Sequence, residues 1–305
     1  MYPTNYINDI VLFLKALISN QLAKYAPETY TKLTHQTGRG SGEEHPTEIA
    51  EYFIKCFHDY RLQIGLDENN FINFLKEKNI LEYGPGDILG VAFLMYAYGA
   101  KKVDCVDSFP LARVSDKSIN VYEILLNSID KDKRDRASKA FNIKDDPKSG
   151  FNTDMINYCI KKDGLSGGHN QYDLVISRAV LEHVNNLEKI FKDIKEAMKD
   201  NGLSIHQVDL KSHGLDRYTE FDFLAWPGCL YNLMYSYKGF PNRWRVNKYI
   251  ELANAFDLKI KHISPTDIID MEKLDIVYPK LRPEFRVIPR EQLSWLGFWI
   301  HLEHC

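Results

Sequence analysis

From Asn79 to the end of the chain, short apolar runs alternate with segments of helix length. This alternation is the sequence feature that constrains the fold most. Neighbouring parallel strands need long crossover connections, and these connections usually contain a helix. The alternation predicts an α/β fold, a Rossmann-like doubly wound sheet with helices on both faces. Strands are expected over residues 80–83, 102–106, 172–177, 203–210, 258–263 and 295–303, with a weakly marked one within 155–161. Helices are expected over 87–98, from 187 to the pair Asn201-Gly202, and over 246–256.

Before residue 79 the pattern is helical, which predicts a helical N-terminal attachment over residues 1–78 and an α/β domain over residues 79–305. The clearest helix follows Pro46 and Thr47, where apolar side chains recur at helical spacing. These are Ile49, Phe53, Cys56, Phe57 and Tyr60. The glycine-rich segment 38–42 is expected to be an exposed linker, or else a hinge or a loop that covers a ligand.

Composition narrows the functional classes. The chain has 39 Lys and Arg against 42 Asp and Glu, and no run of basic residues stands out, which argues against a nucleic-acid partner. Its five cysteines are far apart and form no C-x-x-C pair, so a cytoplasmic setting is expected. The apolar stretch 6–22 contains Asp9 and Lys15 and has no signal-peptide cleavage site, which indicates an amphipathic helix and no membrane association.

The segment Leu81-Glu82-Tyr83-Gly84-Pro85-Gly86-Asp87 is the most informative motif, because it runs from a strand through a tight turn towards a helix. Gly84 and Gly86 permit a turn that side chains would block, and they let a ligand lie against the backbone. Asp107 ends the next strand, 23 residues after Gly84. A carboxylate in this place can accept hydrogen bonds from the ribose hydroxyls of an adenosine.

A dinucleotide-binding domain has similar features, but the glycine spacing argues against it. Its fingerprint needs a third glycine at position 89, where this chain has Leu89. Glu82, just before the first glycine, would repel a pyrophosphate. A carboxylate there suits a ligand that has an ammonium and a sulfonium group, so charge favours S-adenosylmethionine over NAD.

Together with the turn and Asp107, the run 172–184, Tyr-Asp-Leu-Val-Ile-Ser-Arg-Ala-Val-Leu-Glu-His-Val, resembles the successive motifs of class I S-adenosylmethionine-dependent methyltransferases. The resemblance covers about residues 78–305. It implies a seven-stranded sheet whose last strand is antiparallel, and S-adenosylmethionine as the cofactor. It also implies cofactor-binding roles, with Glu82, Gly84 and Gly86 around the methionine moiety, Asp107 and the adjacent Ser108 near the ribose, and Ser177 and Arg178 near the transferring methyl group. The adenine contact stays open.

Methyl transfer from a sulfonium is an in-line displacement, and a hydroxyl acceptor must also lose its proton. Candidate catalytic residues therefore follow the fourth and fifth strands: His183, Asp209 and His213. For His183 a structural role is favoured. Asp209 and His213 are expected to form an oriented base pair, with a purely structural loop as the alternative. His206 and Asp209 face opposite sides of their strand, so they are not expected to share a metal ion. A metal site that uses Asp209 and His213 is the weaker alternative, because two assured ligands are too few, and no metal is predicted.

Residues 216–244 contain nine aromatic side chains, and an insertion over about 214–245 is expected to cap the acceptor side of the sheet. Ordinary core packing or a dimer contact is the alternative, compatible with a cap. Arg243 and Arg245 are candidates for binding an anionic group of the acceptor, although surface ion pairs are the simpler expectation.

These observations favour an enzyme that methylates a hydroxyl of a sugar or a sugar-like small metabolite. The segment 206–214 resembles one found in methyltransferases of polysaccharide and natural-product gene clusters. The alternatives are N-methylation of a small amine or guanidine, and a non-catalytic partner that binds the cofactor. A nucleic-acid methyltransferase is disfavoured by the balanced charge, and a homodimer is left open.

Overall fold

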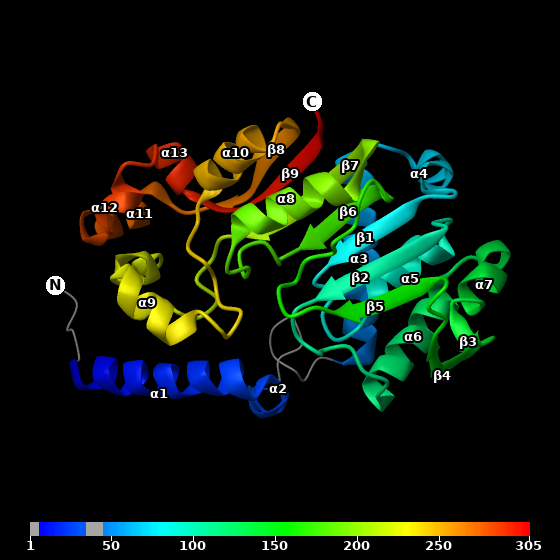
Figure 1. The fold of residues 1–305 in the computed structure, drawn as a ribbon, viewed down its shortest axis with the longest axis horizontal. Coiled ribbons are helices and arrows are strands. Elements are labelled where there is room, and N and C mark those ends of the chain that lie inside the picture. The colour runs from blue at the N-terminus through cyan, green and yellow to red at the C-terminus, as the bar shows by residue number, and fades with distance from the viewer. Residues whose placement is uncertain (1–5, 35–44) are drawn as a thin grey trace.

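A central seven-stranded sheet organises the molecule in the computed structural model, which describes residues 6–34 and 45–305 (Figure 1). The segment 38–42, expected to be a linker or a hinge, lies outside the described residues. The strand order is β5-β2-β1-β6-β7-β9-β8, and only β9 runs antiparallel to its neighbours. The predicted fold class, including the antiparallel last strand, is therefore confirmed. The strands are β1 (Asn79–Tyr83), β2 (Lys102–Asp107), β5 (Ile156–Ile160), β6 (Tyr172–Arg178), β7 (Met198–Asp209), β8 (Leu258–Ile268) and β9 (Trp295–His304).

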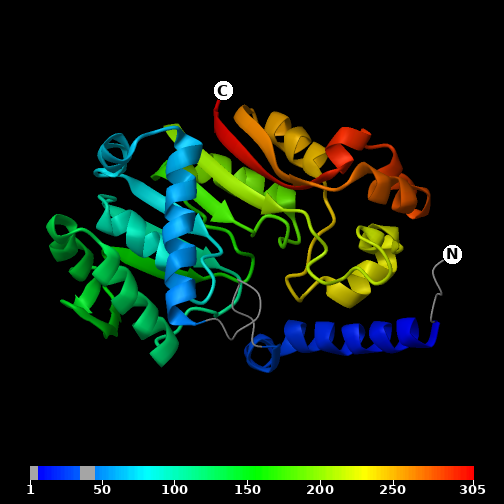
Figure 2. The same ribbon diagram turned by 180° about the vertical axis from the view of Figure 1, so that it is seen from behind.

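Helices cover both faces of this sheet. On one face, α3 (Pro46–Ile64), α5 (Gly90–Ala97) and α6 (Asp116–Ser128) share a hydrophobic cluster with β1 and β2 (Figure 2). On the other face, α8 (Leu187–Ala197) and α10 (Val246–Ala255) share a second cluster with β6, β7 and β9 (Figure 1). The first cluster also includes residues of α4 (Glu68–Leu75), of α7 (Lys131–Ser138) and of a small antiparallel pair of strands, β3 (Phe141–Ile143) and β4 (Asp146–Phe151).

Two predicted helix boundaries are wrong. Helix α5 begins at Gly90 rather than at residue 87, because the residues after Gly84 still belong to the turn, and the N–H of Leu89 donates to the Tyr122 hydroxyl. Helix α8 ends at Ala197, before the Asn201-Gly202 pair. Met198 is already extended and pairs with Tyr172, so β7 begins directly after the helix.

The N-terminal helices belong to two different environments. The helix α3 and its neighbour α4 bury their apolar faces in the same cluster as the sheet. The helix α1 (Tyr6–Tyr25), followed by α2 (Pro27–Thr34), lies away from the sheet and packs on α9 (Gly228–Tyr235) (Figures 1 and 2). The expected domain boundary at residue 78 stays a prediction. Among the described helices, none combines the length and apolar character that crossing a lipid bilayer requires.

Beside the sheet, α1 and α9 join a helical lobe with its own hydrophobic cluster (Figure 1). It also contains the short helices that precede β9. Its remaining elements are η1 (Asp222–Ala225), α11 (Met271–Val277), η2 (Tyr278–Lys280), α12 (Pro283–Arg286) and α13 (Arg290–Leu293).

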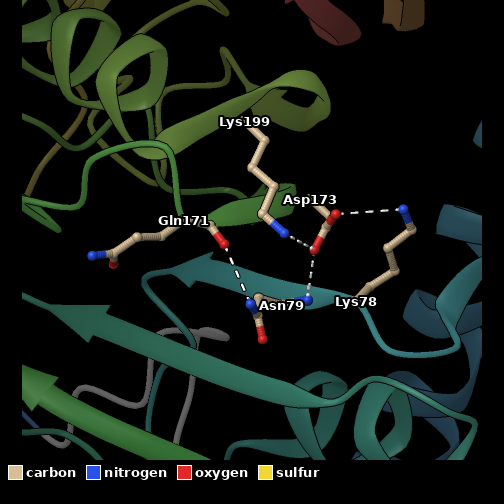
Figure 3. A network of polar contacts seen from close by, with 5 residues as sticks. All are labelled: Lys78, Asn79, Gln171, Asp173 and Lys199. Atoms are coloured by element: carbon tan, nitrogen blue, oxygen red, sulfur yellow. Dashed lines mark hydrogen bonds and ion pairs between the residues drawn. The ribbon is translucent and has the colours of Figure 1, made fainter.

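A polar network ties together the amino ends of three central strands (Figure 3). The carboxylate of Asp173 in β6 accepts hydrogen bonds from the backbone N–H of Asn79 and from Nζ of Lys199, both at 2.9 Å, and lies 3.4 Å from Nζ of Lys78. Asn79 also donates to the carbonyl of Gln171. This network anchors β1, β6 and β7 at the edge opposite the predicted site, whose residues lie at their carboxyl ends.

Candidate functional site

The turn between β1 and α5 is built on two glycines in the left-handed region, Gly84 (φ +60°) and Gly86 (φ +80°). A Cβ atom on Gly84 would lie 2.5 Å from Cγ2 of Val180, which follows β6. Residue 84 must therefore be glycine for two reasons, its backbone conformation and the close approach of the next loop. The contact also brings the segment after β6 against the turn.

The structure brings Asp107 to the same turn. The N–H of Gly84 donates to the carbonyl of Val106 at 2.8 Å, and the Asp107 carboxylate accepts from the N–H of Phe109 at 3.0 Å. Burial raises the pKa of Asp107 to about 6, although the backbone N–H groups of Phe109, Ser108 and Gly86 oppose this effect. The predicted proximity of Asp107 to the glycine turn is thus present. The side chain of Ser108 is exposed next to it.

Glu82 is buried at the end of β1, with only 7% of its surface exposed. Burial raises the pKa of its carboxyl group to about 8, and the Cys105 thiol and the backbone N–H of Ala92 only partly offset this. Neither contact is a cation. A buried carboxyl group without a cationic partner prefers its neutral form, and a positively charged ligand would favour the ionised form.

Ser177 and Arg178 point in different directions. Ser177 is fully buried, and its Oγ lies 2.7 Å from Nδ1 of His206, the residue opposite it in β7. Arg178 forms an ion pair with Asp59 of α3 at 3.0 Å, and its guanidinium lies over the ring of Trp299. Their expected place near the transferring methyl stays a prediction.

Arg178 and Asp59 also line a cavity of about 230 Å³ beside α3, together with Lys55, Gln63, Gln207 and Trp299. Sequence reasoning missed Asp59, because the helical pattern around it indicated only core packing.

Four titratable side chains converge at the carboxyl ends of β6 and β7, and we name them the carboxyl-edge cluster: Glu182, His183, Asp209 and His213. Nε2 of His183 lies 3.7 Å from Oε1 of Glu182, and Nε2 of His213 lies 3.9 Å from Oδ2 of Asp209. The two imidazole rings meet edge to face, with centroids 4.8 Å apart. Because β6 and β7 are adjacent parallel strands, the loops that follow them meet at one edge.

Burial dominates the electrostatics of this cluster. Glu182 is 1% exposed, and neither of its carboxylate oxygens accepts a hydrogen bond. Burial and the nearby Asp209 raise the pKa of Glu182 well above its usual range, and the backbone N–H groups of Glu182 and Asp209, which are near the carboxylate but outside hydrogen-bond geometry, only partly oppose this. Burial, and to a smaller extent His213, lower the pKa of His183 to about 3, although the backbone of Gly239 has the opposite effect. His183 is therefore neutral at physiological pH.

The loop after β7 holds His213 in the left-handed region, at φ +52°, and Gly214 follows at φ +81°. A non-glycine residue in this region is uncommon and needs support from its surroundings. Here Lys211 N–H donates to Asp209 at 2.9 Å, which stabilises the bend after the strand. The predicted pair of Asp209 and His213 is therefore brought together, although 3.9 Å exceeds a hydrogen-bond distance.

The aromatic segment is mainly core. Phe221, Phe223, Tyr231 and Tyr235 are buried in the cluster of the helical lobe. The end of the segment nevertheless reaches the carboxyl-edge cluster. Asn242 donates its backbone N–H to the carbonyl of Glu182 at 2.6 Å and its side-chain amide to the carbonyl of Leu181 at 2.8 Å.

Arg243 and Arg245 are not the surface ion pairs that the sequence led us to expect. Nη1 of Arg243 donates to the carbonyl of Trp226 at 2.7 Å. Arg245 is buried, packs over the ring of Phe221 and donates to the carbonyl of Leu210 at 2.8 Å. Both side chains join the segment to the sheet, because their planar guanidinium groups satisfy backbone carbonyls that would otherwise lack donors.

Glu182 lies in the run 172–184, but the sequence did not indicate it as a site residue. The available signal was its position next to His183, directly after a strand end. Its burial depends on packing between distant segments, which the local pattern does not contain.

Comparison with known proteins bears on the fold and the cofactor. A family model described as a methyltransferase domain matches residues 57–263. Curated protein sequences yield no match to the chain.

Among solved structures, the chain is similar to a proposed S-adenosylmethionine-dependent methyltransferase from Listeria monocytogenes (16% identity, TM-score 0.42, covering 82% of this chain and 97% of that one). An S-adenosylmethionine-dependent methyltransferase from Mesorhizobium loti has 14% identity and a TM-score of 0.42, covering 79% and 95%. A proposed sarcosine dimethylglycine methyltransferase from Galdieria sulphuraria has 16% identity and a TM-score of 0.42, covering 84% and 85%.

The family model spans more than half of the chain, and it includes the glycine turn, Asp107 and the carboxyl-edge cluster. The chain therefore belongs to the methyltransferase domain family.

Proposed function

We propose that this enzyme methylates a hydroxyl group of a small, sugar-like metabolite, with the acceptor bound at the carboxyl ends of β6 and β7. The observation that carries the proposal is the carboxyl-edge cluster, which gathers two imidazoles and two carboxyl groups beside the glycine turn. A hydroxyl is a poor nucleophile until it loses its proton, so its methylation needs such groups near the acceptor.

We propose that Glu82, the glycine turn, Asp107 and Ser108 hold the cofactor. Bound there, S-adenosylmethionine supplies an electrophilic methyl group. The cofactor's positive charge would stabilise the ionised form of Glu82, which burial disfavours in the free protein. Asp107 would accept hydrogen bonds from the ribose hydroxyls, since its carboxylate lies beside the turn.

Within the cluster, His213 is the proposed base and Asp209 its positioning residue. A pKa of about 3 makes His183 a weak proton acceptor, which supports a packing role for that ring. His213 is partly exposed, with 30% of its side chain accessible, so an acceptor can reach it. Asp209, at 3.9 Å, can orient the imidazole after a small closure.

Incubation with labelled S-adenosylmethionine and fractionated metabolites, followed by mass spectrometry of the labelled product, tests the proposal. A product methylated on oxygen is expected. His213→Ala should reduce turnover while leaving cofactor affinity intact, and His262→Ala, an exposed histidine on β8, is the matched control.

A product methylated on nitrogen, with turnover retained in His213→Ala, would refute the hydroxyl acceptor. The absence of any labelled product, with cofactor binding that Asp107→Ala abolishes, would instead indicate a non-catalytic binding partner.

We also propose a cytoplasmic setting, in which the enzyme acts without a nucleic-acid or membrane partner. The support is that all five cysteines are free and that the formal charge is balanced at −3.

A further inference from the structure

We infer that the carboxyl-edge cluster binds a divalent transition-metal ion, with Glu182, His183 and His213 as ligands and Asp209 beside them. One ligand atom from each of the three residues lies within 4.8 Å of the others. Around an ion with bonds of about 2.1 Å, ligand atoms in a tetrahedron are about 3.4 Å apart. Movements of roughly 1 Å in the ligand atoms would therefore close the site.

The strongest evidence is the unsatisfied carboxyl group of Glu182. It is 1% exposed, and neither oxygen accepts a hydrogen bond. Buried polar groups in folded proteins almost always have partners, and an orphaned one costs roughly 1–3 kcal/mol. Nδ1 of His183 is likewise buried without a hydrogen-bond partner. The carboxyl group of Glu182, with Nε2 of His183 at 3.7 Å, can therefore still accept a cationic partner, and both groups are of types that ligate metals.

The chemistry of the donors indicates which ion would bind. Two imidazole nitrogens and one carboxylate suit zinc and similar first-row ions, whereas magnesium and calcium prefer oxygen donors alone. Asp209, 3.9 Å from Nε2 of His213, can orient that ring from the second coordination shell or become a fourth ligand.

The fold explains why the sequence did not predict this site. From the sequence, only Asp209 at the end of the strand and His213 in the loop after it were candidate ligands, and two are too few. Glu182 and His183 come from the preceding crossover, and only the adjacency of β6 and β7 adds them.

Whether the ion binds does not depend on the proposed function. Only the effect of the ion on catalysis rests on that proposal. A bound ion that coordinates the acceptor oxygen would lower the pKa of the hydroxyl. His213 would then be a ligand rather than the base.

The test is titration of chelator-treated, full-length protein with Zn²⁺ and with Co²⁺, without cofactor or acceptor. Calorimetry should show one saturable site, and Co²⁺ should give the visible absorption of a low-coordinate complex. Glu182→Gln and His213→Ala should each weaken Zn²⁺ affinity at least about 10-fold. His262→Ala is the control, because His262 also has a histidine neighbour, with ring centroids 5.1 Å apart, and its loss should leave affinity unchanged.

Retained binding of S-adenosylmethionine in each variant shows that it is folded, and it tests the proposed cofactor site separately. Zn²⁺ affinity that is equal in wild type, Glu182→Gln and His213→Ala would overturn the inference. The inference would also be overturned if the wild-type protein showed no saturable site for Zn²⁺ or Co²⁺. This measurement requires no variant.

Discussion

Glu82→Gln should change how the stability of the cofactor-free protein depends on pH. Burial raises the pKa of Glu82 from 4.5 to about 8. A tenfold change in an acid dissociation constant corresponds to about 1.4 kcal/mol, so ionising this group in the folded state costs about 5 kcal/mol. Because the folded pKa is the higher one, its contribution to stability is fully present below pH 4.5 and is lost as the pH rises to about 8. The glutamine variant has a neutral side chain of similar shape at every pH.

The variant should therefore gain stability over wild type by about 1.4 kcal/mol per pH unit between pH 4.5 and 8, with little change outside this range. Urea unfolding of both proteins from about pH 4.5 to 9 measures the difference. Glu188→Gln, on the exposed side of α8, removes the same charge and should follow the wild-type profile.

The same reasoning predicts that cofactor binding releases close to one proton at about pH 7, because the cationic ligand favours ionised Glu82. Calorimetry in buffers of different ionisation enthalpy measures this release, and Glu82→Gln should abolish it. A stability difference between wild type and Glu82→Gln that is constant with pH to within about 1 kcal/mol would refute a buried, uncompensated carboxyl group.

Three further perturbations test other parts of the structure. Asp107→Asn should weaken cofactor binding about 10- to 100-fold by calorimetry, and wild-type affinity should fall as the pH drops below about 6; unchanged affinity would contradict the ribose contact. Gly84→Ala should destabilise the protein by at least about 1 kcal/mol more than Gly65→Ala in urea unfolding, because both positions have positive φ but only Gly84 meets a neighbour, Val180. Asp173→Asn should cost roughly 1–3 kcal/mol at about pH 7. Burial raises the pKa of Asp173, but the hydrogen bonds from Lys199 and Asn79 outweigh burial and lower this pKa below 3.8. The loss of stability should therefore fade as the pH falls below 3.8 and through the lower folded-state pKa, and a loss that stays constant down to about pH 2 would exclude an electrostatic origin.

The sequence alone determined the fold class and the candidate cofactor segment. The alternation of strands with helices, and the glycines of the turn at the end of β1, are local patterns, because they follow from backbone sterics and from the burial of short apolar runs. The proximity of Asp107 to the turn followed from strand order, since the carboxyl ends of neighbouring parallel strands meet. The ends of α5 and α8 were missed, because a turn and a strand pairing decided them.

Only the tertiary structure decided the composition of the acceptor side. The same aromatic residues suit a cap or a core, and four of the nine are buried in the cluster of the helical lobe. Glu182 and His213 are far apart in the sequence, and they meet because β6 and β7 are neighbours and Asn242 ties the later segment to the loop after β6. Burial of a carboxyl group is a property of all the segments that surround it, so no local window of sequence contains it.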